Sequence, residues 1–384
     1  MSKILIDVTR LLTRLYDGLL PTGVDRVGLA YVQRYGGQAR AVLSERGVSS
    51  VLTERDSLKA FEWLTSSICN RNSIRRLVIS ACTSSLRKTA FERGILLHTS
   101  HNGMEFQRYY RAMERRNVRS VFMVHDLIPL THAEYCRPAV DQAHRQRIRT
   151  ALEHADGLIV NSRFTLDSLI AEAQQAHLRM PPAVIAHLAS GLPVRAHGKR
   201  PIDTPYFVFL STIEPRKNHW LILHVWRRIV EEYGNAAPKL VIIGRRGWEC
   251  ENVIDMLERC VALKGVVIEE ASCSDERLST YLQYAQALLF PSFVEGYGMP
   301  LVEALELQVP VLASDIDVFH EIAGDIPEYI DPLDGLGWIA QIKEYMQPES
   351  RARAAQLDRA KHFRPPTWTT HFERVDDFIG SLQT

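Results

Sequence analysis

The chain has 384 residues, of which 46% are hydrophobic and 24% charged, and its formal net charge is +1. This length favours two domains, and this composition excludes a disordered or fibrous chain. No apolar run approaches the roughly 18 residues of a membrane span, and the first residues form a strand-like segment without a cleavage site. The six cysteines have neither C-x-x-C nor zinc-finger spacing, which predicts free thiols in a reducing cytoplasm.

The small net charge is the sum of two oppositely charged halves. Residues 1–195 hold 27 Lys and Arg against 17 Asp and Glu, or +10, whereas the remainder holds 19 against 28, or −9. A basic half indicates an anionic partner, such as a membrane surface or a lipid-linked phosphate. Nucleic acid is not expected, because no recognised nucleic-acid-binding motif accompanies the charge.

The first predicted elements place a glycine at the start of a helix. Lys3–Val8 has the pattern of a buried strand, a loop containing Gly18 and Pro21 follows, and Val27–Tyr35 has helical periodicity. Gly23 therefore lies at a loop-to-helix transition, where the backbone can approach a ligand closely. An ordinary helix cap is the alternative.

Residues 36–105 are the least informative part of the sequence, and the pattern changes after them. Residues 77–82 (LVISAC) and 95–100 (ILLHTS) predict short buried strands. Residues 105–119 (EFQRYYRAMERRNVR) interleave aromatic residues with arginines, as a basic amphipathic helix does. Such a helix can lie on an anionic bilayer, or it can cover the protein's own core.

A strongly apolar strand, SVFMVHDLIPL, ends at His125 and Asp126. Ligands collect at the carboxyl ends of strands in an open α/β sheet, so His125 is expected at a site. The alternative is a histidine hydrogen-bonded to a loop carbonyl. Further strands are predicted within residues 154–170 and 181–190, and the polar residues 196–205 are typical of an interdomain linker.

The second half again alternates strands and helices. Strands are predicted at residues 206–211, 239–244 and 265–270, and Ser274 is expected to cap the next helix. Arg216 and Lys217 come just after the first of these strands. Two cations there can neutralise a departing pyrophosphate, Arg through a forked donor pair and Lys as a compact charge. A solvated Arg-Lys pair is the alternative.

Residues 287–314 combine a strand, a glycine-containing loop, a helix and a second strand. Gly296 and Gly298 lie in the loop and can take backbone angles that other residues resist. A helix is predicted from Pro300 to Leu307, and the free N–H groups of its first turn would favour a phosphate.

Two carboxylates flank this junction. Glu295 lies in the loop and Glu303 in the helix, with seven residues between them. A carboxylate repels phosphate, so Glu295 is expected to face a sugar and Glu303 a ribose. Together these roles describe a nucleotide sugar. The alternative is a surface loop followed by an ordinary amphipathic helix.

The run PSFVEGYGMPLVEAL resembles the E-x7-E signature of the retaining GT-B glycosyltransferases of family 4, the group 1 glycosyltransferases. STIEPRKN, VIIGRRGW, SCSDERLSTYLQYAQALLFPS and DIDVFHEIAGD occur in the order that this family has. The resemblance implies an α/β GT-B fold, with two Rossmann-like domains facing a cleft. It implies an acceptor-binding domain at residues 1–195 and a nucleotide-sugar-binding domain at 203–365. Residues 366–384 would form a helix, beginning near Trp368, that crosses back to the first domain.

The resemblance also implies roles for single residues. The implied catalytic set is His125, Glu295, Arg216 and Lys217. The implied nucleotide-sugar-binding set is Gly23, Arg216, Lys217, Glu295, Gly298, Met299 and Glu303. Gln308 stands where the family usually has glycine, which puts a tight turn in question. Asp315 and Asp317 have the D-x-D spacing of metal sites in a different glycosyltransferase fold, but here they are expected to serve a loop and a helix cap. No metal and no cofactor is expected.

The implied activity is retaining, metal-independent transfer of a hexose, mannose or a related deoxyhexose, in surface-polysaccharide synthesis. The donor would be a nucleotide-diphosphate sugar, GDP-linked in preference to UDP-linked, and the acceptor a glycan or a polyprenyl-diphosphate-linked glycan. Peripheral contact with the inner face of a membrane is one explanation of the basic half. A nucleotide-sugar epimerase or hydrolase and an inactive binding module are alternatives. A dinucleotide-dependent oxidoreductase is disfavoured, because no G-x-G-x-x-G follows the first strand.

Overall fold

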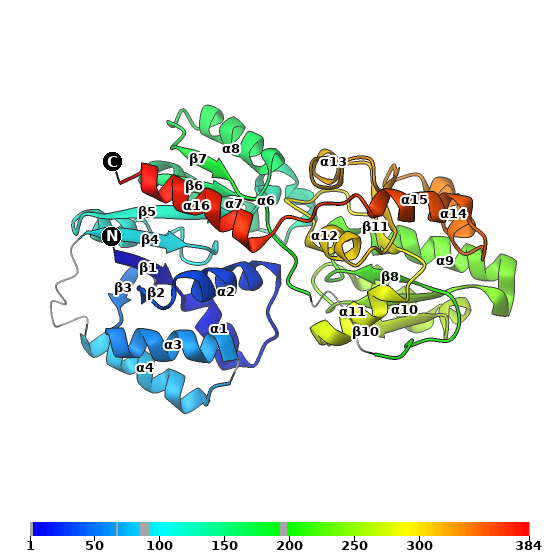
Figure 1. The fold of residues 1–384 in the computed structure, drawn as a ribbon, viewed down its shortest axis with the longest axis horizontal. Helices are drawn as coiled ribbons and strands as arrows, with labels where there is room; N and C mark the ends of the chain where they lie inside the picture. Colours follow the sequence, from blue (N-terminus) through cyan, green and yellow to red (C-terminus); the bar gives the residue numbers. More distant parts are fainter. Residues whose placement is uncertain (1–2, 67, 85–92, 193–197, 384) are drawn as a thin grey trace. The chain divides into compact units, whose positions relative to one another are not determined.

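The computed structural model describes residues 3–66, 68–84, 93–192 and 198–383, and the chain divides into two compact units. Unit 1 comprises Met1–Thr131, Ala139–Leu188 and Trp368–Thr384, and unit 2 comprises His132–Pro138 and Ala189–Thr367. Each unit has its own sheet and its own core (Figure 1). The predicted linker, residues 196–205, lies partly outside the described residues.

Unit 1 is built on a seven-stranded sheet in the order β3-β2-β1-β4-β5-β6-β7, which is parallel except for the β2–β3 hairpin. Its strands are β1 Lys3–Asp7, β2 Ala39–Glu45, β3 Val48–Val51, β4 Gly94–His98, β5 Val118–Val124, β6 Gly157–Val160 and β7 Ala183–Ile185. All residues of β4 and β6 are buried, because helices cover both faces of a parallel sheet. The predicted strands at residues 95–100 and within 154–170 and 181–190 are confirmed.

Unit 1 also contains helices that the sequence analysis did not anticipate. Its helices are α1 Thr9–Asp17, α2 Gly23–Tyr35, α3 Glu54–Ser66, α4 Arg71–Ser84, α5 Gln107–Glu114, α6 Ile128–Thr131, α7 Val140–His154, α8 Arg163–Gln175 and α16 Trp368–Ser381. The strand predicted at residues 77–82 is wrong, since these residues belong to α4. Leu77 and Ala81 are buried whereas Val78 and Ile79 are exposed, a helical spacing that the short apolar run concealed.

The loop predicted between the first strand and Gly23 is in large part a helix. Leu11 and Leu12 of α1 are buried, and Gly18 ends the helix in the left-handed conformation with φ 70°. The predicted loop is therefore confined to the residues that follow α1. Helix α2 begins at Gly23 itself, with Thr22 as its N-cap.

The basic amphipathic segment at residues 105–119 forms α5 and the start of β5. The aromatic side chains of Tyr109 and Tyr110 are fully buried and belong to the core of unit 1, whereas Arg108 and Arg111 are exposed. The apolar face thus covers the protein's own core, the second of the two alternatives. Within the described ranges, no helix combines the length and the apolar character needed to cross a bilayer.

The C-terminal helix α16 belongs to unit 1, as the predicted fold requires. The hydroxyl of Tyr31 in α2 donates to His371 Nε2 (3.0 Å), whose Nδ1 donates to the carbonyl of His187 (3.0 Å). Arg34 forms an ion pair with Asp376 at 2.6 Å. Helix α16 therefore contacts both α2 and the segment that follows β7.

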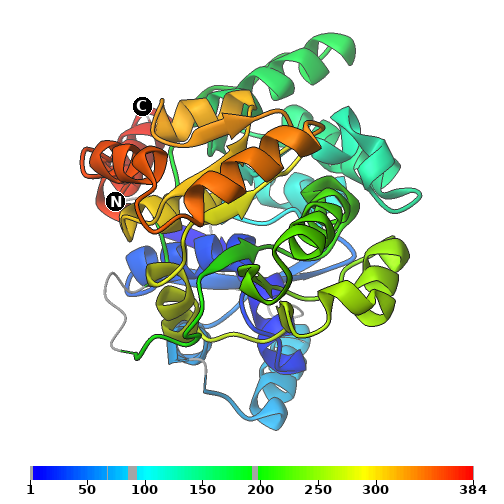
Figure 2. The same ribbon diagram turned by 90° about the vertical axis from the view of Figure 1, so that its right-hand side faces the viewer.

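Unit 2 is a six-stranded parallel sheet in the order β10-β9-β8-β11-β12-β13, with helices on its two faces (Figures 1 and 2). Its strands are β8 Tyr206–Leu210, β9 Lys239–Ile243, β10 Val267–Glu270, β11 Leu288–Phe290, β12 Val311–Ser314 and β13 Glu328–Ile330. Its α-helices are α9 His219–Tyr233, α10 Glu251–Arg259, α11 Asp275–Gln283, α12 Met299–Glu306, α13 Asp317–Ala323, α14 Gly335–Tyr345 and α15 Arg351–Ala360. Numbered within the unit, the order is 3-2-1-4-5-6, which is that of a Rossmann fold. Ser274 caps α11, as predicted, by accepting a bond from the Arg277 N–H.

The chain makes a tight turn at Gln308, although glutamine stands there instead of the glycine that the family usually has. Gln308 has φ 56° and is exposed, and it lies just beyond α12, where the Val309 N–H bonds to the Ala304 carbonyl (2.8 Å). A side chain in the left-handed region costs about 1–2 kcal/mol, and glycine avoids that cost but loses more chain entropy. We expect Gln308→Gly to raise the free energy of unfolding by about 0.5–1 kcal/mol, measured by urea denaturation. Gln308→Ala keeps the Cβ atom and should bring no gain; an equal gain would refute this explanation.

Candidate functional site

The candidate site of unit 2 lies where the strand order of its sheet reverses. Strands β8 and β11 are neighbours and pair in parallel, but the chain leaves them toward opposite edges of the sheet. Ligands of open α/β sheets bind outside the carboxyl ends of strands at such a point. Residues 211–218 follow β8 and residues 291–298 follow β11, so the two predicted motifs meet there.

Arg216, Lys217 and Glu295 form one ion-paired cluster at this point. Glu295 is only 6% exposed, and its Oε2 accepts a bond from Arg216 Nη1 at 2.8 Å. Its Oε1 accepts bonds from Lys217 Nζ and from the Ser292 hydroxyl, the latter at 2.7 Å. The alternative of a solvated Arg-Lys pair is therefore wrong, because both cations contact a buried carboxylate.

Two further residues of the cluster were missed by the sequence analysis. Glu214 is 5% exposed, and its Oε1 lies 2.7 Å from Arg216 Nε. Ser292 is fully buried, and its hydroxyl donates to Glu295 Oε1, the oxygen that Lys217 also contacts. Glu214 lies in the motif STIEPRKN and Ser292 in the motif PSFVEG. The signal that could have identified Glu214 was an acidic residue two positions before Arg216.

The backbone positions the two cations. Residues Pro215–Lys217 form a short 3-10 turn, and Asn218 follows it with φ 63° while its side-chain amide donates to the Pro332 carbonyl (2.7 Å). The Phe293 N–H donates to the Arg216 carbonyl at 2.9 Å, which ties the two loops together. The side chains of Arg216 and Lys217 keep only 20% and 10% of their surface exposed. The cations are thus held in place before any ligand arrives.

The electrostatics of the cluster keep Glu295 ionised. Burial alone would raise the pKa of Glu295, but the charges of Arg216 and Lys217 outweigh burial and hold the pKa at about 2. Burial raises the pKa of Glu214 above its usual value and lowers the pKa of Lys217. The cluster therefore presents a permanently charged carboxylate beside two cations that it partly neutralises.

The start of α12 contains the remaining predicted residues of unit 2. Gly298 has φ 116°, and a Cβ atom there would lie 2.9 Å from the Phe319 ring, so the fold itself requires glycine. Gly296 is not in the left-handed conformation. Met299 is the first helical residue and is half-buried, and Glu303 is 5% exposed. The binding roles of Gly298, Met299 and Glu303 stay predictions.

His125 directly follows β5 in unit 1 and is 5% exposed. Its Nε2 lies 2.8 Å from the Thr99 carbonyl, which can only accept, so Nε2 carries the proton. Burial lowers the pKa of His125, which keeps the ring neutral and leaves Nδ1 as a hydrogen-bond acceptor. The bond to the Thr99 carbonyl agrees with the alternative given in the sequence analysis, a histidine hydrogen-bonded to a loop carbonyl. The role of His125 in catalysis stays a prediction.

Gly23 is the first residue of α2 in unit 1. The Thr22 N-cap and Asp25 form a capping box, and Asp25, 2% exposed, also pairs with Arg10 and Arg14 at 2.7 Å each. A Cβ atom at Gly23 would meet nothing within 4 Å. The fold of unit 1 therefore does not itself require glycine at this position.

Gly23→Ala separates a binding role from a structural one. We expect the melting temperature to stay the same or rise, corresponding to at most about 1 kcal/mol, because alanine is the better helix former. We expect the KM for donor or acceptor to rise if the predicted close approach of a ligand is correct. Steady-state kinetics beside a thermal melt decide this, and unchanged kinetics would favour the ordinary-cap alternative.

His219, next to Asn218, gives the candidate site a pH-dependent contribution to stability. Burial, with a smaller effect of Lys217, lowers the pKa of His219 to about 3, and its ring stacks on Phe209 at 4.1 Å. The unfolded chain binds a proton below pH 6.5 whereas the folded protein does not, so stability is lost as pH falls from 6.5 toward 3. By pH 5 we expect a loss on the order of 2 kcal/mol from this group. His219→Phe should flatten the dependence of the melting temperature between pH 7 and 5; an unchanged slope would contradict the assignment.

The D-x-D residues do not form a metal-like cluster. Asp315 Oδ1 lies 2.7 Å from His320 Nε2, and Asp317 is the first residue of α13. In the part of the chain that the structure describes, no group of three His, Cys, Asp or Glu side chains could hold a metal ion. Asp315 thus has a local contact in its loop, but the expected helix cap is not formed, because Ile316 is the N-cap of α13 and no side chain bonds to the cap.

Residues 194–328, which include the cluster and α12, match the family described as Glycosyl transferases group 1. These residues form a group 1 glycosyltransferase domain. Residues 95–177, which include His125, match the family described as Glucosyltransferase 3-like, N-terminal domain. The resemblance stated from the sequence motifs is therefore confirmed.

Curated relatives of the chain include enzymes of O-antigen synthesis. The serotype-specific mannosyltransferase WbdA of Escherichia coli is 28% identical over 275 residues, which are 66% of this chain and 34% of WbdA. The O-antigen chain mannosyltransferase B of Escherichia coli is 32% identical over 168 residues, or 43% of this chain and 44% of that protein. The chain thus spans about a third of the length of WbdA.

Solved structures show the fold of the chain over its whole length. Anabaena Alr3699/HepE, in complex with UDP-glucose, has a TM-score of 0.72 at 13% identity and covers 99% of this chain and 100% of its own. Sucrose-phosphate synthase from Thermosynechococcus elongatus has a TM-score of 0.67 at 14% identity, with 100% and 99% covered. The predicted GT-B fold of two Rossmann-like units is confirmed.

Proposed function

We propose that the chain is a retaining hexosyltransferase of surface-polysaccharide synthesis that takes mannose or a related deoxyhexose from a nucleotide-diphosphate sugar. The observation that carries this proposal is the buried cluster of Arg216, Lys217 and an ionised Glu295 at the switch point of a group 1 domain. Cations fixed at this position suit a diphosphate, and a fixed carboxylate suits the hydroxyl groups of a sugar.

The chemistry follows from where charge develops. As the bond between the sugar and the diphosphate breaks, negative charge grows on the leaving diphosphate, and Arg216 and Lys217 stabilise it without reorganising. Glu295 accepts hydrogen bonds from the sugar and keeps it in place. The acceptor hydroxyl attacks from the face that the diphosphate leaves and passes its proton to the departing diphosphate, so an α-linked donor gives an α-linked product. With two cations on the diphosphate, the reaction needs no metal ion.

A GDP-linked donor is supported by the named activities of the relatives. Those that are 28% and 32% identical are mannosyltransferases, whereas HepE, whose structures contain UDP and UDP-glucose, is only 13–14% identical. One of these relatives is by name an O-antigen chain mannosyltransferase. We therefore propose a glycan or a polyprenyl-diphosphate-linked glycan as the acceptor.

The first experiment is a thermal melt of the protein with GDP, UDP or ADP at equal concentrations. A ligand that binds only the folded state raises the melting temperature, by about 2.7 kcal/mol of added stability at 100 times its Kd. We expect the largest shift with GDP. A shift with UDP alone would replace the GDP donor by a UDP donor, and no shift with any nucleotide would count against the donor site.

The second experiment is transfer from GDP-mannose to a lipid-linked or glycan acceptor, with and without EDTA. We expect an α-linked product by NMR and equal rates in both samples. A β-linked product would exclude a retaining mechanism, and loss of activity with EDTA would exclude metal independence. Free mannose without a glycoside would indicate a hydrolase.

A further inference from the structure

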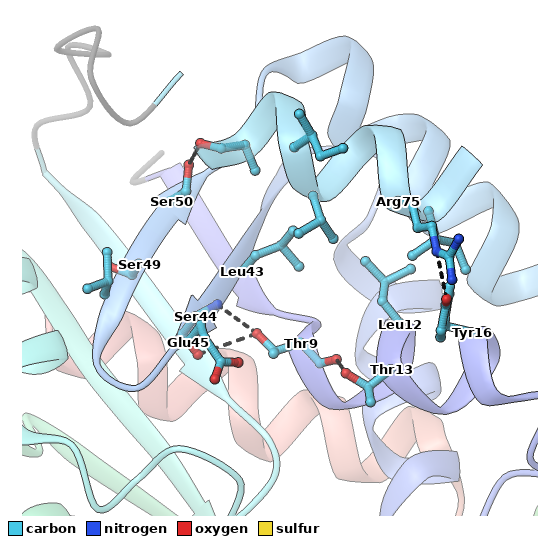
Figure 3. A pocket seen from close by; sticks show the side chains of 15 residues that line it. Thr9, Leu12, Thr13, Tyr16, Leu43, Ser44, Glu45, Ser49, Ser50 and Arg75 are labelled. Carbon is cyan, nitrogen blue, oxygen red and sulfur yellow. Dashed lines mark hydrogen bonds between the residues drawn. The ribbon is translucent and has the colours of Figure 1, made fainter. Parts of the chain in front are cut away.

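Unit 1 contains a cavity of about 740 Å³ that has no part in the site described above. It lies between α1, α4 and the β2–β3 hairpin, as Figure 3 shows. Typical ligand pockets have roughly 300–1,000 Å³, so the cavity is large enough for a small molecule. None of its lining residues was assigned a role in sugar transfer.

The wall of the cavity is apolar. It includes six aliphatic side chains, namely Leu12, Leu43, Val48, Ile74, Val78 and Ile79. Three of them are unusually exposed, with 60% of Val48, 42% of Val78 and 64% of Ile79 accessible. Aliphatic groups that are exposed together on one cavity indicate an apolar ligand or partner.

Hydroxyl groups of the wall are already engaged within the protein. Thr13 Oγ1 donates to the Thr9 carbonyl (2.9 Å), and Ser50 Oγ donates to the Ala81 carbonyl (2.9 Å). Thr9 Oγ1 accepts from the Ser44 N–H at 2.8 Å (Figure 3). Ser44 Oγ donates to Asp7 Oδ2 (3.0 Å). A sugar or a nucleobase would find few free partners here, whereas a hydrocarbon chain needs none.

Two arginines beside the cavity lack a carboxylate partner among the described residues. Arg71 and Arg75 lie one turn apart on α4 and place their guanidinium groups 5.7 and 5.4 Å from the Tyr16 ring centre. Arg75 lines the cavity, and its Nε donates to the Tyr16 hydroxyl at 2.7 Å (Figure 3). Helix α4 contains no acidic residue.

The positive charges of Arg71 and Arg75 lie beside the same Tyr16 ring, so an anionic group could bind to both. Phosphate binds guanidinium groups well. The one acidic lining residue, Glu45, is 85% exposed and lies 3.7 Å from Arg46, so it does not neutralise these arginines. The surface beside the cavity thus offers positive charge where the cavity offers apolar contact.

We propose that this cavity binds the single hydrocarbon chain of a phosphorylated long-chain alcohol, with its phosphate at Arg71 and Arg75. Such a lipid would be the carrier of the acceptor glycan, and in this respect the inference rests on the proposed function. A single cavity suits one chain better than the two chains of a phospholipid. The basic character of residues 1–195 is consistent with an anionic ligand in this unit.

Farnesyl phosphate is the probe, and the full chain is titrated with it by isothermal calorimetry, beside farnesol and inorganic phosphate. We expect farnesyl phosphate to bind, farnesol to bind at least about fivefold more weakly, and inorganic phosphate not to bind measurably. Absence of farnesyl phosphate binding overturns the proposal, and so does equal affinity for farnesyl phosphate and inorganic phosphate.

Ile79→Glu places a charge on the cavity wall at an exposed position, so the fold should tolerate it. We expect it to weaken farnesyl phosphate at least about tenfold, because a carboxylate would be buried against the chain. The control is Ile68→Glu, which changes a side chain that is 76% exposed and does not line the cavity. Val48→Glu repeats the test from the hairpin. Equal affinity of all four proteins overturns the proposal.

Arg71→Gln tests the phosphate contact. We expect it to reduce the affinity for farnesyl phosphate to that for farnesol while leaving farnesol unchanged. Binding to phosphatidylglycerol vesicles that survives Ile79→Glu, without farnesyl phosphate binding, would mean adsorption to the lipid surface and would overturn the proposal. None of these measurements uses a nucleotide, so failure here is distinguishable from failure of the GDP melt.

Discussion

Lys217→Ala should reduce kcat by about two to three orders of magnitude and weaken the binding of the nucleoside diphosphate. Lys217 donates to Glu295 from a side chain that is 10% exposed, so its charge is fixed and desolvated before the donor arrives. Removing it takes away half of the positive charge that stabilises the leaving diphosphate. The kcat for sugar transfer and the Kd for GDP measure the two effects.

The same substitution also has a structural effect, which must be measured separately. Loss of one partner of an isolated buried ion pair costs about 3–5 kcal/mol, but Arg216 and Ser292 still contact Glu295 in the variant. We therefore expect a loss of roughly 1–3 kcal/mol and assay the variant well below its melting temperature. Arg227→Ala is the matched control, because the ion pair that Arg227 forms with Glu231 on α9 lies at the surface. Equal kcat values for wild type and Lys217→Ala would refute the assignment to the diphosphate.

The sequence predicted the strands of the second unit better than those of the first, because a short apolar run can form either a buried strand or one face of a helix. FVFL, LVII and ALLF are each bounded by charged or loop residues and appear as β8, β9 and β11. In unit 1 the run LVIS at residues 77–80 has the same length and three apolar residues but belongs to a helix. What distinguishes this helix from a strand is that Ile74, Leu77 and Ala81 are buried along one face. That burial arises because α4 packs against α1 and β3, which the sequence does not show.

The cluster was predictable in its members but not in its pairing. The motifs identified Arg216, Lys217 and Glu295, yet they assigned the cations to the diphosphate and the carboxylate to the sugar as if these groups were separate. The structure adds that all three are in contact and that Glu214 and Ser292 complete the set. This pairing follows from the adjacency of β8 and β11, two strands that lie about 80 residues apart in the chain. Spacing along the sequence carries no such information.

Pairing changes what the carboxylate can be expected to do. With a pKa of about 2, Glu295 is a charged acceptor at any pH where the protein is assayed, and it is not a proton donor. Its charge also weakens the field of Arg216 and Lys217 toward an incoming diphosphate. The carboxylate therefore has two opposing effects, since it orients the sugar and it competes with the phosphate for the same cations.

Glu295→Gln separates these effects. The amide has almost the same shape and still accepts hydrogen bonds, but it removes the negative charge beside the two cations. We expect kcat to fall by about two to three orders of magnitude while the affinity for GDP stays the same or increases, opposite to the effect of Lys217→Ala. The control is Glu258→Gln. It removes the same charge from a half-exposed ion pair with Arg246 in the same unit, away from the cluster.

The comparison of the two variants decides which group acts on which part of the donor. If Glu295→Gln weakens GDP as much as Lys217→Ala does, Glu295 serves only to hold the cations in place, and the sugar must be oriented by other residues. If kcat falls while GDP binding is preserved, the loss arises after the diphosphate is bound, where only contacts to the sugar or to the transition state remain. A rise in GDP affinity would further show that the unliganded site is restrained by its own carboxylate, so that donor binding requires Arg216 and Lys217 to exchange part of their contact with Glu295 for the diphosphate.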